Sequence, residues 1–495
     1  MIKRLIACTL LLMIAMSSTV FAASPRQSFR VESYIYNRVG ADADAVIATH
    51  SPLPYRFYRS VTARDMGVPA LSNINDMFYH DGQFYIAHAN QLIITDMDLV
   101  AHTILEGVYE NGTFHPFTHI EGIFITRTGE VYLTQPFDAR LVHLDKDLNL
   151  VRFLGHPEGL LIPAGLSYQP QQVAVDQNGR IYVISGNVLE GLVEINPDGT
   201  FNRFFGVINV TFTATELFWR NLQTTAQRAR VQLWLPTTFT NLTIDRHGFI
   251  YATISDGDLG ESVRKLNARG ANILRRPDYG TPSIGDLNFN LFGFGLPVGP
   301  SMMSQVEVTD FGVYYVFDRT RNRIFAYDTD GHLLFAFGGR GEREGLTQNV
   351  VGMTLAENMI LLADRANNSI EIFERTQYGI YVLEAARYQY NADYRTAADY
   401  WRRVLEMNPY FQYANLGVGR ALYRSGNFLE AQEYFRRAQN VQYFSRAFQQ
   451  TRSEMLARNF TAIGVGIGVI IALIIFRSIY KKIRPFRRLK RGAIL

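Results

Sequence analysis

The stretch from Val313 to Gly345, VYYVFDRTRNRIFAYDTDGHLLFAFGGRGEREG, decides the fold of this chain. Its runs of aromatic and branched residues, Tyr314 to Phe317, Arg323 to Tyr327 and His332 to Phe337, are typical of strands. The turn from Asp328 to Gly331 separates the last two runs, and Asp and Gly tolerate the left-handed backbone that tight hairpins need. A small sheet of this kind cannot bury both of its faces alone, so the pattern predicts packing against copies of itself.

Copies of this unit can be aligned on the turn that precedes the first strand. Successive copies of that turn lie 47, 50, 69, 64 and 46 residues apart, at Asp81-Gly82, Thr128-Gly129, Asn178-Gly179, His247-Gly248, Phe311-Gly312 and Glu357-Asn358. A second turn, again mostly rich in Asn, Asp or Gly, follows the next strand. Units of about 45 to 70 residues are longer than most solenoid repeats and match propeller blades. The sequence therefore predicts a mainly β protein with a six-bladed β-propeller.

The last two units carry the most specific motif. Asp318 to Ile324 (DRTRNRI) and Asp364 to Ile370 (DRANNSI) both place an Asp after one strand and an Asn before the next. Together with Gly331 and Phe337-Gly338-Gly339, this pattern resembles the NHL-repeat family of β-propellers. The resemblance implies a propeller over residues 50–376. The N-terminal run from Tyr55 to Val61 is the candidate strand that closes the ring, which would remove exposed sheet edges.

Residues 1–22 have the pattern of a signal peptide. Lys3 and Arg4 precede the apolar run from Leu5 to Met16, and Val20-Phe21-Ala22 provides a cleavage site. Cys8 is the only cysteine, and a lipoprotein signal would need its apolar stretch before that residue rather than after it. Cleavage near Ala22 leaves an exported chain without disulfides, so its stability has to come from its core.

The C-terminal end carries a second membrane signal. Residues 459–480 are nearly all apolar, which predicts a transmembrane helix, with a buried helix of a soluble domain as the alternative. Residues 477–491 hold eight basic side chains and no acidic one. Because positive charge stays on the cytoplasmic side, we expect a single-pass protein of the cell membrane, with the tail 481–495 in the cytoplasm and the bulk outside. Anionic lipid headgroups are the expected partners of Lys481, Lys482, Arg484, Arg487 and Arg488.

The charge balance argues against a nucleic-acid partner. Without Lys3, Arg4 and the eight tail cations, 39 basic residues face 45 acidic ones, so the external part is near −6. Such a chain offers no general basic surface for DNA or RNA.

Residues 378–458 change to a helical pattern with a period of 34 residues. Its recurring positions pair Tyr394 with Phe428, Ala397 with Ala431, and Trp401 with Phe435. This period, with Gly419 and Gly426, resembles the tetratricopeptide (TPR) family. The resemblance implies a concave groove for a peptide or partner helix, for which Tyr394, Trp401, Phe428 and Phe435 are the candidate residues. A stiff spacer between propeller and membrane is the alternative.

Two insertions interrupt the propeller pattern. Residues 213–232 have helical spacing, with Leu217, Phe218 and Leu222 on one face. The segment from Pro277 to Pro300 is rich in Gly and Pro and carries three phenylalanines. Insertions of this kind lie on one rim of a propeller, where their aromatics either stack on sugars or peptides or pack onto the propeller face.

The candidate binding residues lie near the starts of the inner strands, where a propeller has its axis. They are Asn75, Asp76, Glu121, Gln172, Asn241, Gln305 with Glu307, and Asn349. Some six-bladed relatives in the broad propeller group are lactonases or esterases that hold Ca²⁺ or Zn²⁺ at the axis. Here the set is mostly amide, whereas hard cations want several converging carboxylates or carbonyls. Glu121 and Asp76 are the ligands if a metal such as Ca²⁺ binds, and a wet channel lined by polar strand ends is the alternative.

No local pattern assigns catalytic residues. The histidines of the first blades have no regular spacing, and no HExxH or Gly-x-Ser-x-Gly motif occurs. The first hypothesis is therefore a membrane-anchored propeller that acts as a binding scaffold for a protein or a glycan, without a cofactor, in an envelope or transport assembly. The alternative hypothesis is a metal-dependent hydrolase of the lactonase or esterase kind.

Overall fold

A computed structural model describes residues 32–38, 46–160, 168–207, 238–255, 262–275, 285–286 and 299–491, with side chains up to Lys481. The predicted signal peptide 1–22 and the helical insertion 213–232 lie outside the described residues, as does most of the segment from Pro277 to Pro300. The chain divides into two compact units, Met1–Ala392 and Asp393–Leu495.

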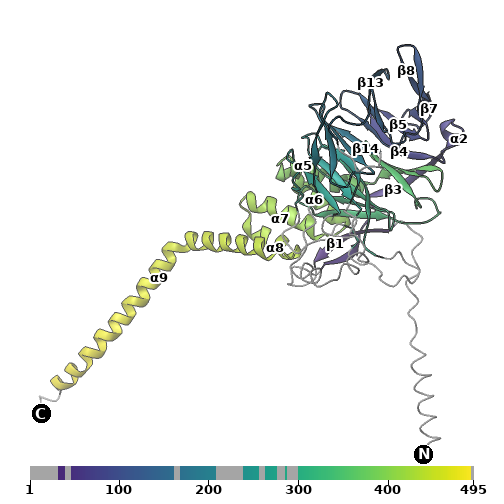
Figure 1. Cartoon of the computed structure of the whole chain (residues 1–495). Helices are drawn as coiled ribbons and strands as arrows, with labels where there is room; N and C mark the ends of the chain where they lie inside the picture. The colour runs from purple at the N-terminus through teal and green to yellow at the C-terminus, as the bar shows by residue number, and fades with distance from the viewer. Residues whose placement is uncertain are drawn as a thin grey trace, which may run out of the picture. The chain divides into compact units, whose positions relative to one another are not determined.

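Unit 1 is a six-bladed β-propeller built from antiparallel sheets (Figure 1). Blade 1 contains β4 (Ile74–His80), β5 (Gln83–His88), β6 (Gln91–Thr95) and β7 (Ala101–Leu105). Blade 2 contains β10 (Ile123–Ile125), β11 (Val131–Gln135), β12 (Arg140–Leu144) and β13 (Leu150–Leu154). Blade 3 contains β14 (Pro170–Val175), β15 (Ile181–Ser185), β16 (Leu192–Ile195) and β17 (Phe201–Phe205). Blade 4 has β18 (Phe239–Ile244), β19 (Ile250–Ile254) and β20 (Val263–Leu266). Blade 5 contains β21 (Met303–Val308), β22 (Tyr314–Asp318), β23 (Arg323–Tyr327) and β24 (Leu333–Gly338). Blade 6 contains β25 (Val350–Ala356), β26 (Met359–Asp364), β27 (Ser369–Arg375) and β3 (Tyr55–Thr62).

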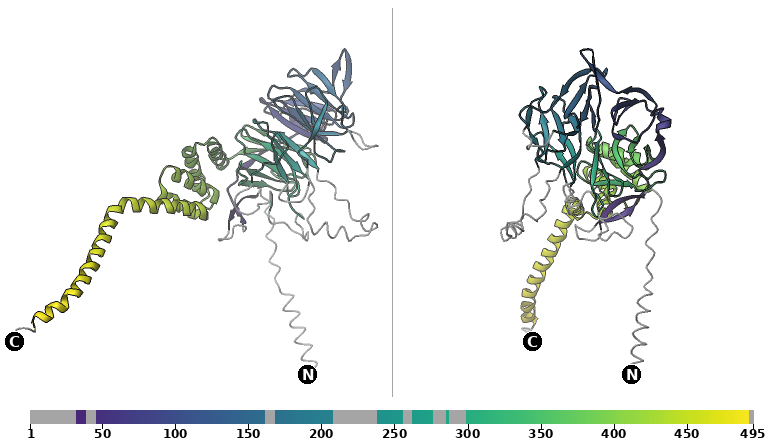
Figure 2. Two further views of the ribbon diagram at one scale, coloured as in Figure 1. Left: turned by 60° about the vertical axis from the view of Figure 1, so that its left-hand side comes forward. Right: turned by 45° about the vertical axis from the view of Figure 1, so that its right-hand side comes forward.

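The inner strands close a ring. Strands β4, β10, β14, β18, β21 and β25 each contact the next inner strand, and β25 contacts β4. The sheets follow one another around the unit (Figure 2). The middle strands are buried on both faces, as β11 and β15 illustrate, because each blade is covered by its neighbours. The predicted mainly β, six-bladed propeller is confirmed.

The predicted turns share one hydrogen-bond arrangement. In blade 2, Asp145 Oδ1 accepts hydrogen bonds from the backbone N–H groups of Asp147 (2.9 Å) and Asn149 (2.8 Å). The same arrangement recurs at Asp96, Asp176, Asp245, Asn267 and Asp328. A short polar side chain that holds its own turn explains why these positions carry Asp or Asn.

The ring is closed by β3, which pairs antiparallel with β27 as the outer strand of blade 6. This confirms the prediction for Tyr55 to Val61. Tyr55 anchors the strand: it is buried, its ring stacks on Phe337 at 5.3 Å, and its hydroxyl lies 3.1 Å from that of Tyr315.

The N-terminal hairpin is a feature that the sequence did not reveal. β1 (Glu32–Arg38) pairs with β24, and β2 (Val46–His50) pairs with β1, so the sheet of blade 5 has six strands. Two further short elements are the helix α2 (Ala63–Met66) and the hairpin of β8 (Gly107–Glu110) and β9 (Thr113–Pro116). This hairpin projects beyond the neighbouring sheets (Figure 1).

Helix α5 (Gln377–Tyr390) belongs to the propeller unit, although the sequence placed it at the start of the helical module. The Thr376 hydroxyl accepts a hydrogen bond from the Gly379 N–H and so caps the helix. At the other end, the Tyr390 hydroxyl lies 2.9 Å from His247 Nε2, and the Arg246 guanidinium lies over the Tyr390 ring. The hydroxyl group and the ring of Tyr390 thus both attach the helix to blade 4.

Unit 2 consists of α6 (Tyr394–Met407), α7 (Gln412–Arg424), α8 (Phe428–Arg437) and α9 (Val441–Arg491). Glycines allow close contact between these helices: a Cβ at Gly417 would meet the Trp401 ring, and a Cβ at Gly419 would meet the Phe435 ring. Both aromatic side chains are fully buried. These contacts form the interior of the unit.

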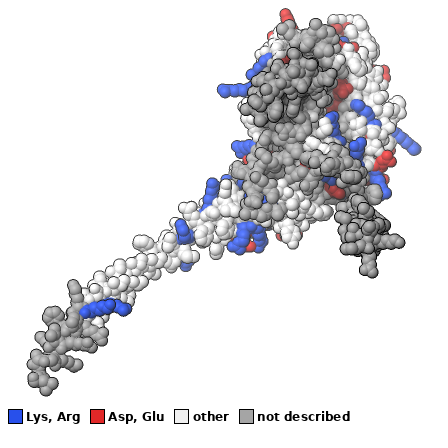
Figure 3. Space-filling view, turned by 60° about the horizontal axis from the view of Figure 1, so that its bottom comes forward, with Lys and Arg blue, Asp and Glu red and all other residues white. Residues whose placement is uncertain are grey.

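Helix α9 contains the predicted membrane segment. Within the described residues, Val441–Lys481 is the one helical segment long and apolar enough to cross a membrane, with a mean hydropathy of 2.4 in its most apolar window. Its apolar side chains are exposed from Phe460 to Tyr480, and the helix is mostly white in Figure 3, with blue side chains near its described end. Length and composition therefore fit a membrane anchor.

Replacing Tyr55 by Ala tests the closing strand. We expect Tyr55→Ala to lower the free energy of unfolding by about 3–5 kcal/mol, because it removes a buried aromatic ring and leaves a cavity between blades. Tyr58→Ala on the same strand, where the side chain is 58% exposed, should change it by less than about 0.5 kcal/mol. Denaturant unfolding of the detergent-solubilised protein measures both, and equal effects of the two substitutions would contradict the assigned closure.

Candidate functional site

The two faces of the propeller differ. At one face, which we call the turn face, the short turns of each blade lie, and α5 contacts the turns at His247 and Gly312. The other face, which we call the loop face, holds two kinds of segment. One kind leads into the inner strand of each blade, and the other kind connects the second strand of a blade to the third. The loop face carries the β8–β9 hairpin, the segment 136–139 and the segment 186–191.

Four of the predicted axial residues occupy one structural position. Asp76, Gln172, Asn241 and Gln305 each follow a β-bulge near the start of an inner strand. Their side chains join one blade to another: Asp76 Oδ2 accepts from Ile123 N–H (3.0 Å), Asn241 Nδ2 donates to Gln305 Oε1 (2.9 Å), and Gln305 Nε2 donates to Val351 O (2.7 Å). Gln172 also hydrogen-bonds to Asp76. These polar groups therefore hold blades together.

Glu121 and Asn349 lie outside this set. The equivalent positions in blades 2 and 6 are Gly122 and Gly352, where a Cβ would come within 2.5 Å of Gln171 O and 3.0 Å of Met77 N, respectively. The side chain of Asn349 is exposed, while its backbone N–H donates to Asp364 Oδ1 (3.1 Å). Glu121 lies one position before Gly122, and Asn349 lies three positions before Gly352, differences that the spacing of turns in the sequence does not resolve.

Glu121 instead forms a cluster at the axial mouth of the loop face. Its Oε2 lies 2.8 Å from His119 Nε2. Asn75 lies beside this pair, where it donates to Ile120 O (2.6 Å) and accepts from Arg365 (2.6 Å). The ring of Phe137, which is 77% exposed, lies 4.9 Å from the His119 ring. A hydrogen-bonded carboxylate and imidazole beside an exposed aromatic ring can bind a polar ligand or move a proton.

Two axial carboxyl groups favour their neutral forms. Burial raises the pKa of Asp76 to about 7 against the hydrogen bonds from Ile123 and Met77, and the charge of Glu121 raises it further. Burial also raises the pKa of Glu307 to about 8, with the charge of Asp76 as the second cause. Solvent reaches part of the Glu307 residue, but protein atoms surround its carboxyl group. The axis therefore holds weakly charged acids near neutral pH.

Neither Asp76 nor the Glu121–His119 pair belongs to a group of three carboxylate or imidazole donors in the part of the chain that the structure describes. Among the described residues, the one group of three carboxylate or imidazole donors within 4.8 Å of one another is Asp328, Asp330 and His332, on the turn face. Asp328 Oδ1 already holds the turn there, and Asp330 forms an ion pair with Arg275 at 2.8 Å. Asp76 uses both carboxylate oxygens to accept backbone N–H groups. The described donor set thus fits a divalent cation poorly at the axis.

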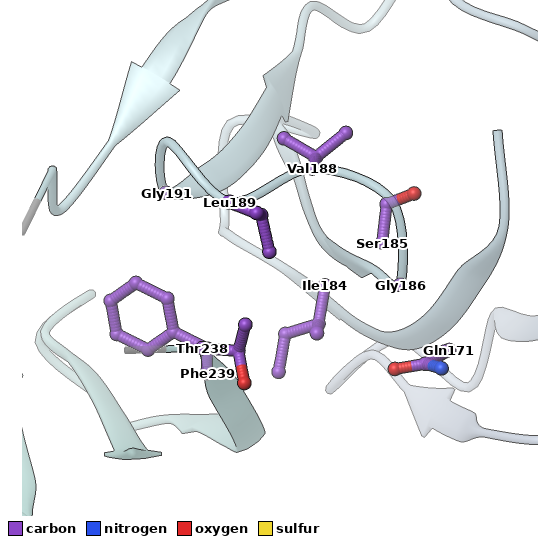
Figure 4. Close-up of a pocket in the computed structure, with 9 residues that line it drawn as sticks. All are labelled: Gln171, Ile184, Ser185, Gly186, Val188, Leu189, Gly191, Thr238 and Phe239. Carbon is purple, nitrogen blue, oxygen red and sulfur yellow. The ribbon is translucent and has the colours of Figure 1, made fainter. Parts of the chain in front are cut away.

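A pocket of about 240 Å³ lies on the loop face between blades 3 and 4 (Figure 4). Its lining comes from the start of β14, from the end of β15 and the loop that follows it, and from the start of β18: Gln171, Ile184, Ser185, Gly186, Val188, Leu189, Gly191, Thr238 and Phe239. The side chains of Ile184 and Leu189 lie between the Phe239 ring and Gln171 in this view. Sequence analysis missed this pocket, because its residues come from three separate segments without a common motif.

The loop face also carries an exposed aromatic pair on the β8–β9 hairpin. Tyr109 is 70% and Phe114 is 45% exposed, and their ring centroids lie 5.1 Å apart. Large apolar side chains that stay in water on a projecting hairpin are typical of contact surfaces. The sequence signal was the aromatic content of residues 107–116, which lie between two blades and outside the repeated strands.

The remaining predicted site residues lie in unit 2. Trp401 and Phe435 are fully buried, so they fill the helical interior rather than an open surface. Tyr394 is covered by the Arg424 guanidinium at 3.4 Å, and Phe428 packs on Tyr423. Of the four candidate residues, the half-buried Tyr394 and Phe428 are partly accessible to a partner, and the other two are not. The partner groove stays a prediction. Helix α9 continues through Lys481, Lys482, Arg484, Arg487 and Arg488.

Comparisons with known proteins give no family. No family model matches the sequence, and no curated protein matches it significantly. Among solved structures, the chain is similar to a streptogramin B lyase (11% identity, 65% of this chain and 98% of that chain, TM-score 0.37). It is also similar to virginiamycin B lyase from Staphylococcus aureus (10% identity, 65% of this chain and 100% of that chain, TM-score 0.39). A third similar structure is the Pan2 WD40 domain of Neurospora crassa (10% identity, 66% of this chain and 98% of that chain, TM-score 0.36). Likenesses this distant carry no argument about what the chain does.

Asp76→Asn tests the protonation of the axis. The pKa of Asp76 in the folded protein lies above that of an unfolded Asp, so wild-type stability falls as pH rises from about 4 to about 7, while the unfolded chain alone loses its proton. Asn does not titrate. We therefore expect the stability of Asp76→Asn relative to wild type to rise by at least about 1 kcal/mol between pH of about 4.5 and 8.5.

Unfolding of the solubilised protein at the two pH values measures this difference. The hydrogen bond from Ile123 favours the ionised carboxylate, and this preference is already contained in the pKa of Asp76, so it adds no separate pH dependence. Asp147→Asn, at an exposed turn position, is the control for the general effect of replacing an aspartate by asparagine. A constant difference for Asp76→Asn would mean that Asp76 is ionised in the folded protein throughout this range.

Proposed function

We propose that this protein is a membrane-anchored, extracytoplasmic binding scaffold whose propeller presents its loop face to a protein or glycan partner. The observation that carries the proposal is the contrast between the faces. Short, self-bonded turns and α5 occupy the turn face, whereas the projecting hairpin, the axial mouth and the pocket all lie on the loop face. Binding residues concentrate on loops that a rigid scaffold positions.

The polar groups of the axis support a scaffold over an enzyme. Asp76, Asn241 and Gln305 direct their side chains to neighbouring blades, so they stabilise the ring. Ligands then have to meet groups at the rim and on the loops. The proposal needs no cofactor and no nucleic acid, in keeping with the acidic balance of the external part.

The membrane part of the proposal rests on both chain ends. We infer that residues 1–22 direct export, that α9 crosses the bilayer at residues 459–480, and that the basic residues from Lys481 onward meet anionic headgroups in the cytoplasm. We also infer that the propeller is of the NHL type and that unit 2 is of the TPR type, which would support a second protein contact. An envelope or transport assembly is the setting that this architecture suits.

Capture of partners from detergent-solubilised membranes tests the scaffold. We expect Tyr109→Ser combined with Phe114→Ser to reduce partner recovery at least about tenfold, because it removes the exposed aromatic pair. Tyr58→Ser, at an exposed aromatic outside the loop face, is the matched control and should leave recovery unchanged. Equal recovery with the hairpin variant and the wild type would contradict a role for this part of the loop face.

A metal-dependent lactonase or esterase is the second candidate, and the Glu121–His119 pair at the axial mouth is the observation that favours it. Metal analysis of the purified protein, with lactone hydrolysis measured in parallel, separates the two candidates. The scaffold proposal expects neither stoichiometric metal nor hydrolysis, and no change in either for Glu121→Gln. Stoichiometric Ca²⁺ or Zn²⁺ that is lost in Glu121→Gln, together with hydrolysis, would favour the enzyme.

A further inference from the structure

The pocket between blades 3 and 4 has the composition of a site for a small neutral ligand. None of its nine described lining residues carries a charge. An ionic ligand would lose hydration there without gaining a counter-charge, which is costly. A ligand that enters this pocket should therefore be uncharged.

Hydrogen bonds hold the two hydroxyl groups of the pocket in place, and Ser185 is buried. The Ser185 hydroxyl accepts a hydrogen bond from Gln169 N–H (3.1 Å), and the Thr238 hydroxyl lies 3.0 Å from that of Ser255. A hydroxyl has one donor and two acceptor positions, so each keeps capacity for a ligand. The backbone of Gln171 is fixed to blade 2, because its carbonyl accepts from the Thr134 hydroxyl (2.9 Å).

The carboxamide of Gln171 is the most accessible polar group of the lining. Its residue is exposed, and the amide lies against the loop at Gly186, where a Cβ would come within 2.9 Å of Gln171 Nε2. The glycine thus leaves room for the amide beside the loop. An amide offers both donors and acceptors, which suits a ligand with several hydroxyl groups.

The apolar part of the pocket faces these groups. Ile184, Val188 and Phe239 are buried, and Leu189 is 37% exposed; Figure 4 shows all four among the lining side chains. The ligand therefore needs one apolar face as well as hydrogen-bonding groups. A sugar ring has this character, with C–H groups on one side and hydroxyls around its edge.

The size of the pocket limits the ligand. A volume of about 240 Å³ corresponds to about eight water molecules at ~30 Å³ each. This is below the range of about 300–1,000 Å³ that is usual for drug-sized ligands. Side-chain hydrogen bonds join blades 3 and 4 at the turn face, from Gln177 to Arg246 O (2.9 Å) and from Arg203 to Ala268 O (2.8 Å), so the pocket lies at the other end of this interface.

We propose that the pocket formed by Gln171, Ser185, Leu189, Thr238 and Phe239 binds one neutral saccharide unit. The proposal rests on the proposed binding function and specifies one ligand class for it. The Gln171 amide and the two hydroxyls bond to the sugar hydroxyls, and Phe239 and Leu189 cover its apolar face. A longer glycan would enter with a single residue and extend over the loop face.

Titration of methyl glycosides into the full-length protein tests this proposal. The protein is placed in phosphatidylcholine nanodiscs, because maltoside and glucoside detergents would compete as sugars. The probes are the methyl glycosides of glucose, galactose, mannose and N-acetylglucosamine, with glucuronate and glucosamine as charged analogues. Saturation-transfer NMR and calorimetry measure binding, for which we expect a Kd on the order of 1 mM for at least one neutral probe.

Two variants locate the binding. Gln171→Ala and Thr238→Val should each weaken binding of that probe about tenfold. Gln348→Ala is the matched control, since Gln348 is the same residue type just before the inner strand of blade 6, and it should bind as the wild type does. Thermal unfolding of each variant confirms that it is folded, and Thr238→Val preserves side-chain shape if Gln171→Ala proves unstable.

Three results would overturn the proposal: no neutral glycoside binds, the charged analogues bind more tightly, or both pocket variants bind normally. Loss of a captured protein partner in Gln171→Ala without any glycoside binding would assign the pocket to a peptide and would also overturn it. If a protein partner is still recovered but no glycoside binds, the saccharide proposal is wrong and the scaffold function is unaffected. The two proposals therefore fail by different results.

Discussion

The propeller depends on polar side chains of the inner strands that reach from one blade to another. A blade of this kind is apolar on both faces and can bury them only against its neighbours. Asp76, Asn241 and Gln305 add direction to that packing, because each makes a hydrogen bond that only one placement of the adjoining blade satisfies. The strand β3 then closes the ring through Tyr55 at the contact of blades 5 and 6. The polar residues that the sequence suggested as ligand-binding groups therefore stabilise the ring through hydrogen bonds between blades.

The sequence predicted features that repeat and missed features that depend on long-range contacts. Asx turns such as that at Asp145 and the strand at Tyr55 leave local patterns of polar and aromatic residues, so their places were foreseeable. The pairing of β1 with β24 joins segments about 300 residues apart and leaves no such pattern. In blade 2 the inner-strand position that Asp76 holds in blade 1 is occupied by Gly122 rather than by Glu121, a one-residue difference that the spacing of the turns does not resolve. Helical periodicity placed Trp401 correctly on a contacting face, but periodicity does not distinguish an interior from a groove.

The asymmetry of the two faces connects fold to function. Turns that satisfy their own backbone, such as the one at Asp328, leave little for a partner to bind, and α5 covers part of that face. The loop face instead combines an aromatic pair at Tyr109, an imidazole–carboxylate pair at His119, and a neutral pocket beside Gln171. These three features differ in chemistry, which suits a surface that contacts a large partner at several points. Rigid blades keep them at fixed positions without an ordering cost on binding.

Site-specific photo-crosslinking in intact cells tests most directly whether the loop face is the working surface. A benzophenone amino acid replaces Phe137, which is 77% exposed at the axial mouth, or Lys146, whose side chain is 71% exposed at a turn of the same blade on the opposite face. Our account predicts that irradiation joins a partner to the probe at position 137 and not to the probe at position 146. Crosslinks from position 146 alone, or equally from both positions, would contradict it.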